Sequence, residues 1–406
     1  MEKFNQGGLM NIKYITGYAG TGKSHDLVEL TKALDPATSV ILAPTHKALK
    51  RLEGKTNPLI LAQTIHAFLG WRPGINENAE ELGHIDVTIK KVKPVEGLTT
   101  VVIDEAGMMS EDMLFSIVER FEELYDYETD CITMWLFLDP YQLPPVKGRQ
   151  IQVDPTHQEN RTIQYRAESP DLVALFTKFV HYIEHSNHND LTTPLSENVL
   201  GAKAFKNFKV GDRCLAYTNE AVGKHNQTIA KLLGITSYIN QEVQIGNLTE
   251  THKIDEILNP NEKYLTNIYH TGELYMQDMN INKNFLSNSI CALINHPQIS
   301  FIRVGCYIMP VIFGTHNAHV ARKKAREKAI GDRKYFADVY ALGRAFTCDY
   351  TFASTVHKSQ GSEFDMVWID KQDILKSSMN NNYRQYARMM YVALSRAKKT
   401  VVIYGS

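Results

Sequence analysis

The sequence predicts an α/β protein with two parallel-sheet domains, a small insertion in the first domain and a β-rich insertion in the second. Short apolar runs alternate with amphipathic stretches in the first half of the chain, and this alternation returns near the C-terminus. A glycine-rich segment, GYAGTGKS at 17–24, follows the first apolar run. Between the two halves, residues 235–342 are rich in turns and strand-like patterns and end in a basic helical stretch.

The first domain is expected over residues 1–160. Each of its apolar runs ends in a polar or glycine-containing segment, which is where ligands bind along the edge of a parallel sheet. The runs that we interpret as its strands cover residues 13–16, 39–43, 99–104 and 132–139. The small insertion at residues 70–97 contains Trp71 and a strand-like segment.

The second domain is expected over residues 161–234 and 343–406, with the β-rich insertion between its two parts. Its C-terminal part repeats the alternation of strands and helices. The elements predicted there are strands at 349–354, 364–370 and 400–405 and a helix at 383–397.

Composition and charge narrow the class of protein. Hydrophobic residues make up 43% and charged residues 22% of the chain, which is ordinary for a soluble globular protein, and the apolar runs are too short to span a bilayer. Because the N-terminus has no secretory pattern, we expect a cytoplasmic protein. The net charge of −1 means that any nucleic acid must bind in local grooves. The five scattered cysteines argue for reduced thiols and against a zinc site.

The segment GYAGTGKS fits the pattern G-x-x-x-x-G-K-[ST] of a phosphate-binding loop between a strand and a helix. Backbone N–H groups of such a loop point at phosphates, and the helix N-terminus adds positive potential. We expect Lys23 to contact the β- and γ-phosphates of a nucleotide and Ser24 to coordinate Mg²⁺. The other residues predicted to bind the nucleotide here are Gly17, Ala19, Gly20, Thr21 and Gly22. The alternative is a glycine-rich turn that binds nothing, which the strand-loop-helix setting disfavours.

Two further strand ends carry side chains that suit phosphate chemistry. In VVIDEAG (101–107), Asp104 is predicted to hold Mg²⁺, directly or through water, and Glu105 to polarise the attacking water. By itself such a pair is usually a solvated strand end, but this one follows an apolar strand downstream of the phosphate loop. In LFLDPYQLPPV (136–146), the amide of Gln142 is predicted to bond the γ-phosphate or its water. The alternative is a rigid proline-rich loop.

Taken in order, these motifs resemble those of the superfamily-one helicases. The similarity extends to APTHKA (43–48), TIHAFLG (64–70), QYR (164–166), STVHKSQGSEFD (354–365) and YVALSRAKK (391–399). The last two segments look most like the RecD-like and Dda-like branch, which translocates 5′ to 3′. The resemblance covers residues 17–399. It implies two RecA-like domains, ATP hydrolysis with Mg²⁺, and movement along single-stranded DNA and forked duplexes. It also implies contacts with a single-strand-binding protein or with other proteins of replication, repair and recombination.

The resemblance nominates further residues around the nucleotide. Arg166 and Arg396 would supply positive charge to the transition state, a role worth roughly 10³–10⁵ in rate. The alternatives are a surface ion pair for Arg166 and a cation at a helix C-terminus for Arg396. Gln360, Gly361 and Glu363 would form a turn that faces the nucleotide. For Gly361 alone, an ordinary helix-ending glycine is the other interpretation.

The resemblance also nominates contacts with the DNA strand. Such contacts bind phosphates without reading sequence, and aromatic side chains stack on bases. The predicted residues are Pro44, Thr45, His46, Lys47, Thr64, His66 and Trp71 in the first domain and Thr355, His357 and Lys358 in the second. A structural role is the alternative for His66. The basic run 321–328 is better explained as a solvated helix face than as a phosphate contact. The insertion at 70–97 would be the pin that splits the duplex.

Two functional alternatives remain open. One is an RNA helicase of the same architecture, because phosphate contacts and stacking do not distinguish the two sugars without contacts to the 2′-hydroxyl. The other is a nucleotide-dependent switch that binds nucleic acid without unwinding it. The segment YVALSRAKK, with its candidate cation Arg396, argues against the switch.

Overall fold

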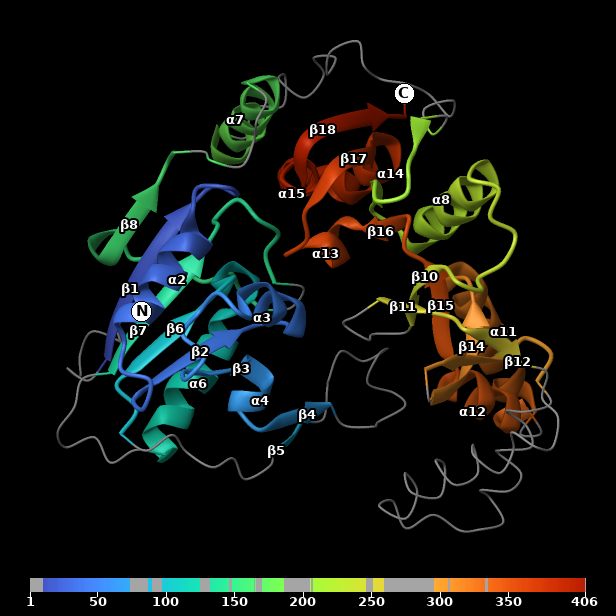
Figure 1. Ribbon diagram of the computed structural model, residues 1–406, viewed down its shortest axis with the longest axis horizontal. Coiled ribbons are helices and arrows are strands. Elements are labelled where there is room, and N and C mark those ends of the chain that lie inside the picture. The colour runs from blue at the N-terminus through green and yellow to red at the C-terminus, as the bar shows by residue number, and fades with distance from the viewer. Residues whose placement is uncertain are drawn as a thin grey trace. The chain divides into compact units, whose positions relative to one another are not determined.

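The computed structural model describes residues 10–73, 87–89, 97–124, 132–145, 148–163, 165, 170–185, 205, 207–245, 251–258, 296–305, 307–332 and 335–405 (Figure 1). The chain divides into two compact units. The first comprises Met1–Thr193, Gln360–Glu363 and Ser378–Thr400, and the second comprises Pro194–Ser359, Phe364–Ser377 and Val401–Ser406. None of the helices in the described part of the chain has the length and apolarity needed to cross a membrane.

The first unit is built on a six-stranded parallel sheet with the order β3-β2-β6-β7-β1-β8. The strands are β1 (Met10–Gly17), β2 (Ser39–Ala43), β3 (Leu61–Thr64), β6 (Thr100–Ile103), β7 (Ile132–Leu138) and β8 (Gln158–Arg161). Every residue of β2 is buried, as expected for an inner strand with both faces covered. The predicted strands of the first domain are therefore confirmed.

Helices cover both faces of this sheet (Figure 1). They are α2 (Lys23–Ala33), α3 (His46–Leu52), α4 (Ile65–Phe68) and α6 (Glu111–Leu124). The first unit also contains α7 (Pro170–His185) and α15 (Tyr383–Leu394), which pack against each other. On one face, Leu42 of β2 packs in the same cluster as Phe121 of α6. On the other face, Ile41 packs with Leu27 of α2 and Leu52 of α3. Successive residues of β2 thus serve opposite sides of the sheet.

Only the base of the insertion at 70–97 is described. Strands β4 (Trp71–Pro73) and β5 (Val87–Ile89) pair antiparallel in a small two-stranded sheet. Residues 74–86 and 90–96 lie outside the described residues. The assignment of this insertion as a duplex-splitting pin therefore stays a prediction.

The second unit contains the other parallel sheet, with the order β16-β9-β17-β18. Its strands are β9 (Arg213–Ala216), β16 (Ala353–Thr355), β17 (Phe364–Asp370) and β18 (Ala397–Tyr404). Strand β9 pairs in parallel with β16 and β17. The associated helices are α8 (Asn219–Leu232), α13 (Val356–Ser359) and α14 (Lys371–Leu375). Trp368 and Phe208 anchor the core of this sheet.

A mixed six-stranded sheet, with the order β11-β10-β15-β14-β13-β12, forms the rest of the second unit. Its strands are β10 (Glu242–Ile245), β11 (Thr251–Lys253), β12 (Glu256–Leu258), β13 (Ser300–Val304), β14 (Tyr307–Phe313) and β15 (Phe346–Tyr350). Its pairs are antiparallel except β14 with β15. Helices α11 (Thr315–Gly331) and α12 (Phe336–Arg344) pack with it (Figure 1). The predicted fold class, two parallel sheets with a β-rich part in the second half, is confirmed.

Helix α11 contains the basic run at 321–328. Ala321 and Ala325 are buried against α12 and the sheet. Lys323, by contrast, is exposed and lies 4.0 Å from the carboxylate of Glu327 one turn later. This arrangement has one apolar face and one charged face, which is typical of a solvated surface helix.

Candidate active site

The phosphate loop connects β1 to α2 in the first unit. Gly22 precedes α2 with a φ of 87°, in the left-handed region that favours glycine. A Cβ atom on Gly17 would lie only 2.4 Å from the carbonyl oxygen of Arg161, so this position accepts no side chain without movement of the backbone. The Nζ of Lys23 donates to the carbonyl oxygens of Gly17 and Tyr18, at 2.7 Å each. The ammonium group therefore lies across the loop that is predicted to hold phosphates.

The two acidic residues follow the buried strand β6. The side chain of Asp104 is 3% exposed and that of Glu105 is 11% exposed. Glu105 has a φ of 51° and a ψ of 36°, a left-handed conformation that is uncommon for a residue with a side chain. Such conformations are concentrated at functional sites, where the surrounding structure holds them in place.

A cation that the sequence did not nominate lies at the centre of the site. The Nη2 of Arg51, from the last turn of α3, is 3.2 Å from Ser24 Oγ and 2.9 Å from Asp104 Oδ2. The same nitrogen is 3.0 Å from Glu105 Oε1. Three oxygens from two segments of the chain, the start of α2 and the end of β6, thus converge on one positively charged atom. Mg²⁺ prefers hard oxygen ligands, so Ser24 and Asp104 fit the metal site predicted for them.

The charges around this point act on the acidic residues in opposite ways. Burial raises the pKa of the Asp104 carboxyl, and the adjacent Glu105 raises it further. Burial also opposes ionisation of Glu105, but the charges of Arg51 and Arg396 outweigh it and hold the pKa of Glu105 below its usual value. Glu105 is therefore ionised at neutral pH and able to accept a hydrogen bond from water.

Gln142 and Asp139 follow β7 and lie beside these groups. The Nε2 of Gln142 donates to Glu105 Oε2 at 3.3 Å. Asp139 is 1% exposed and accepts from the N–H of Tyr141 at 3.0 Å. The structure thus brings Gln142 to the acidic pair, and its contact with the γ-phosphate or its water stays a prediction.

Helix α15 is tied to this loop by two residues that the sequence analysis missed. The hydroxyl of Tyr391 donates to Asp139 Oδ2 at 2.8 Å and accepts from the N–H of Ala19 in the phosphate loop at 2.7 Å. Arg388 donates to the carbonyl oxygens of Pro140 and Gln142. A single buried hydroxyl therefore connects the phosphate loop, the loop after β7 and α15.

Arg396 lies just beyond the C-terminal end of α15 and is 2% exposed. Its Nε donates to the carbonyl oxygen of Val392, as a cation at a helix C-terminus does. Its Nη1 is 3.4 Å from the carbonyl oxygen of Ser362, and its charge contributes to the lowered pKa of Glu105. Both interpretations offered by the sequence thus have a counterpart in the geometry, and the catalytic role of Arg396 stays a prediction.

Arg166 and Gln164 lie outside the described residues. Tyr165, between them, is described, and its N–H donates to the carbonyl oxygen of Gly20 at 2.8 Å. The side chain of Tyr165 is 71% exposed, and its ring carbons lie 3.6 Å from where a Cβ of Gly22 would be. The QYR segment therefore reaches the phosphate loop at Tyr165.

The turn at 360–363 borders a cavity of about 300 Å³ next to the phosphate loop. The residues that line it are Ser24, Val28, Arg51, Leu52, Lys55, Gly361 and Glu363. Gly361 follows α13 with a φ of 73°, and a Cβ there would meet nothing within 4 Å. Its glycine is thus needed for the conformation rather than for close approach. The Nε2 of Gln360 is buried and has no hydrogen-bond partner within the described part of the chain, which leaves a donor for a ligand.

Two models of known protein families match parts of the chain. A family model of an AAA domain matches residues 8–164, and one of a UvrD-like helicase C-terminal domain matches residues 350–404. These two matches agree with the resemblance to the superfamily-one helicases that the motifs predicted. The ATP-dependent DNA helicase Pif1 of Bdellovibrio bacteriovorus is 23% identical over 95% of this chain and 82% of its own length.

Other relatives of this chain are also distant. An uncharacterised protein of Acanthamoeba polyphaga mimivirus is 24% identical over 98% of the chain and 96% of its own length. Among solved structures, Bacteroides Pif1 bound to single-stranded DNA matches with a TM-score of 0.49 and 15% identity, covering 98% of this chain and 89% of that one. Pif1 helicase from Candida albicans matches with a TM-score of 0.45 and 16% identity, covering 97% and 91%.

Two of the predicted DNA contacts in the first unit share one local design. Thr45 ends the segment after β2, and its hydroxyl accepts from the N–H of Ala48 as the N-cap of α3. Thr64 ends β3 and caps α4 in the same way, through the N–H of Ala67. Each threonine thus marks the point where a strand turns into a helix.

The other five candidates of the first unit differ in how exposed their side chains are. His46 is exposed, and Pro44 and Lys47 are half-buried. His66 is exposed and meets Trp71 edge to face, with ring centroids 5.9 Å apart. Trp71 is half-buried against the core. Their contacts with DNA stay predictions.

The candidates of the second unit follow β16. Thr355 accepts from the N–H of Lys358 at 3.3 Å, which repeats the capping arrangement of Thr45 and Thr64. Lys358 is exposed. Burial lowers the pKa of the His357 imidazole, so this side chain is neutral at physiological pH.

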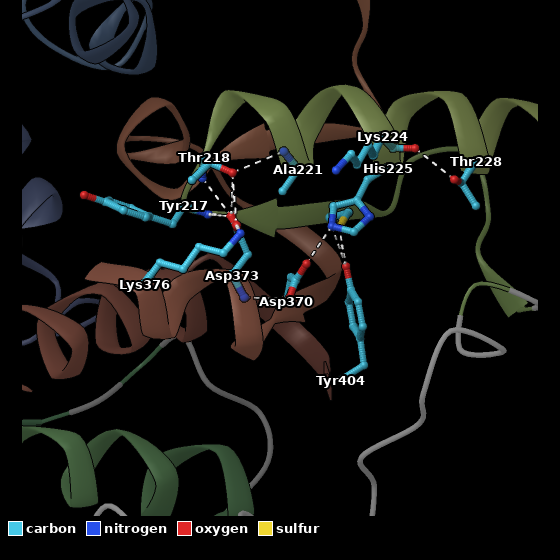
Figure 2. Close-up of polar contacts among 11 residues, drawn as sticks. Tyr217, Thr218, Ala221, Lys224, His225, Thr228, Asp370, Asp373, Lys376 and Tyr404 are labelled. Carbon is cyan, nitrogen blue, oxygen red and sulfur yellow. Dashed lines mark hydrogen bonds and ion pairs between the residues drawn. The ribbon is translucent and has the colours of Figure 1, made fainter. Parts of the chain in front are cut away.

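A polar network fixes the edge of the second parallel sheet next to these candidates (Figure 2). Asp373 of α14 accepts from the backbone N–H groups of Tyr217 and Thr218, at 2.8 and 2.7 Å, and from Lys376 Nζ at 2.6 Å. His225 bonds Asp370 at 2.8 Å. These contacts join the segments that follow β9 and β17, and no sequence motif pointed to them.

Proposed function

We propose that this protein is an ATP-dependent DNA helicase that moves along single-stranded DNA in the 5′ to 3′ direction. The observation that carries the proposal is the convergence of Ser24, Asp104 and Glu105 on one point beside the phosphate loop. A triphosphate in the loop would present its terminal phosphoryl group to a metal-binding carboxylate and to a second carboxylate that can act on water. That combination serves hydrolysis, whereas a loop alone would serve only binding.

Each residue has a defined task in this scheme. Lys23 exchanges its loop carbonyls for the β- and γ-phosphates of ATP. Ser24 and Asp104 hold Mg²⁺, which when bound supplies positive charge to the phosphoryl oxygens. Glu105 accepts a hydrogen bond from the attacking water and orients it. Gln142, bonded to Glu105, changes partner when the γ-phosphate leaves.

Cations stabilise the charge that develops on the transferred phosphoryl group. We assign this role to Arg396 and Arg166. ATP favours a closed arrangement of the two proposed RecA-like domains, because it binds that arrangement more tightly than an open one. Hydrolysis removes this preference. Alternating grip on the strand at Thr45 and Thr64 and at Thr355 and His357 then converts the cycle into a step.

Support for DNA as the track comes from the relatives. The Bdellovibrio relative is named an ATP-dependent DNA helicase, and Bacteroides Pif1 was solved with single-stranded DNA. Another solved structure concerns DNA unwinding at forked double-stranded DNA by two Pif1 helicases. A forked duplex is accordingly the proposed substrate of this chain.

The decisive variant is Lys23→Ala. ATP hydrolysis stimulated by single-stranded DNA should be abolished, while binding of the strand itself stays near the level of the unmodified protein. Lys32→Ala is the matched control, because it removes one lysine from the same helix where the side chain makes only an exposed ion pair with Glu29 at 2.6 Å. Hydrolysis that survives in Lys23→Ala would remove the assignment of the loop.

Two further comparisons test which nucleic acid the protein moves along and in which direction it moves. Matched DNA and RNA oligonucleotides should differ in their stimulation of hydrolysis, with DNA the stronger. Forked duplexes with a single 5′ or 3′ tail should be unwound only from the 5′ tail. Stimulation by RNA alone, or unwinding from the 3′ tail, contradicts the proposal in its substrate or its direction.

A further inference from the structure

We propose that the guanidinium of Arg51 and the magnesium ion are alternative occupants of one position, so that Arg51 sets the metal concentration at which the nucleotide is loaded. The inference rests on the proposed nucleotide site but not on DNA unwinding. Arg51 acts in it as a positioning residue, because it controls the access of the metal to Ser24 and Asp104.

The geometry makes the two cations exclude each other. One nitrogen of Arg51 lies within 3.2 Å of Ser24 Oγ, Asp104 Oδ2 and Glu105 Oε1. A magnesium ion held by Ser24 and Asp104 would sit about 2.1 Å from each ligand oxygen, in the space that this nitrogen fills. Binding of the metal therefore requires the guanidinium to leave.

The negative charges of Asp104 and Glu105 stabilise Arg51 in the position that the metal would take. Asp104 and Glu105 are adjacent in sequence and almost fully buried, with 3% and 11% of their side chains exposed. Two neighbouring buried carboxylates repel each other and are costly to keep ionised without a cation beside them. Arg51 provides that cation, and the metal can replace it without leaving the pair uncompensated.

Two features favour the exchange. First, the Nε of Arg51 is buried and has no hydrogen-bond partner among the described residues, so its present position is not fully satisfied. Second, Arg51 borders the cavity of about 300 Å³ that Glu363 also lines. A displaced guanidinium thus has open space beside it and a carboxylate at the wall of that space.

The test is a titration of Mg²⁺ against binding of a fluorescent ADP analogue. Four proteins are compared: the unmodified chain, Arg51→Ala, Arg51→Lys and the control Lys50→Ala, which removes an exposed positive charge from the same turn of α3. Without its competitor, the metal should bind at lower concentration, so the Mg²⁺ midpoint of Arg51→Ala should fall about tenfold, the size of a typical coupling between two sites. Lys50→Ala should keep the midpoint of the unmodified chain, and Arg51→Lys should lie between.

Thermal unfolding without nucleotide gives a second readout. In the presence of a chelator, Arg51→Ala should unfold at lower temperature than the unmodified protein, and Mg²⁺ alone should restore more of its Tm. A Mg²⁺ midpoint that is unchanged or higher in Arg51→Ala overturns the inference. If Arg51→Ala does not fold, Arg51→Gln is measured in its place. This variant keeps hydrogen-bonding groups but not the charge, and its Mg²⁺ midpoint should also fall about tenfold. Failure of the unmodified chain to bind the analogue at any Mg²⁺ concentration would instead contradict the proposed nucleotide site.

Discussion

Removal of the Tyr391 hydroxyl should affect both the stability of the first unit and its proposed nucleotide site. Tyr391→Phe deletes one oxygen and keeps the ring, which is fully buried. That oxygen donates to Asp139 and accepts from the N–H of Ala19, and both partners are buried as well. Burial, and then the charge of Asp139, raise the pKa of Tyr391 well above its ordinary value, so the hydroxyl stays a donor at every working pH.

The expected loss follows from the two hydrogen bonds. A bond to a charged group contributes about 1.5–3 kcal/mol and one between neutral groups about 0.5–1.5 kcal/mol, so the variant should lose roughly 2–4 kcal/mol of unfolding free energy. Asp139 keeps its bond from the N–H of Tyr141, which limits the loss. Because Ala19 belongs to the phosphate loop, affinity for an ADP analogue should fall about fivefold for each 1 kcal/mol of loop stabilisation that is lost.

Denaturant unfolding and fluorescence titration measure the two effects on the same preparation. Tyr386→Phe is the control, since it removes a hydroxyl from the same helix and leaves both bonds of Tyr391 in place. A loss below about 0.5 kcal/mol, the range of ordinary surface substitutions, together with unchanged nucleotide affinity would refute the connection between α15 and the loop.

Three other variants test separate features. Gly17→Ala should weaken nucleotide binding and lower the Tm, because its Cβ would meet the carbonyl oxygen of Arg161 at 2.4 Å, whereas Gly343→Ala, with no atom within 4 Å, should do neither. Glu105→Gln should reduce ATP turnover by about 10²–10⁴ while the ADP analogue still binds, as steady-state kinetics and titration will show. Burial by itself would raise the pKa of Asp373, but hydrogen bonds from Lys376 and from backbone N–H groups lower it. A carboxyl group whose pKa is lowered by folding stabilises the fold at pH values above its unfolded pKa of about 3.9. At pH 7, Asp373→Asn should therefore unfold at a lower denaturant midpoint than the unmodified protein. This difference should disappear as the pH falls below about 4.

Local signals account for the parts of the fold that the sequence predicted. The strand at 39–43 is an unbroken apolar run, and the structure buries every residue of it. The phosphate loop is equally local, because its glycines, Lys23 and Ser24 are neighbours in sequence and need only the strand before them and the helix after them. Gln142 lies beside the acidic pair because parallel strands β6 and β7 are adjacent and end at the same edge.

Long-range contacts account for what the sequence did not show. Arg51 lies 27 residues from Ser24 and 53 from Asp104, and nothing in its own segment distinguishes it from its neighbour Lys50. Its side chain reaches the acidic pair because β2, which precedes α3, pairs with β6. Tyr391 lies 372 residues from Ala19. Partners this far apart depend on the order of the strands and on the packing of helices, which a pattern of apolar residues does not specify.

The motif YVALSRAKK identified Arg396 as a candidate residue, but it did not specify the role of the side chain. Its Nε bonds the end of its own helix, which a cation at that place would do in any protein, and its charge at the same time acts on Glu105. The two roles are compatible, since bonds to Val392 and Ser395 use Nε and Nη2 and hold the guanidinium in one orientation. A guanidinium fixed in this way is preorganised, so in the proposed catalytic role it would stabilise developing phosphoryl charge without a cost of reorientation. The helix-end contacts that the sequence suggested as an alternative would therefore support the proposed catalytic contact rather than exclude it.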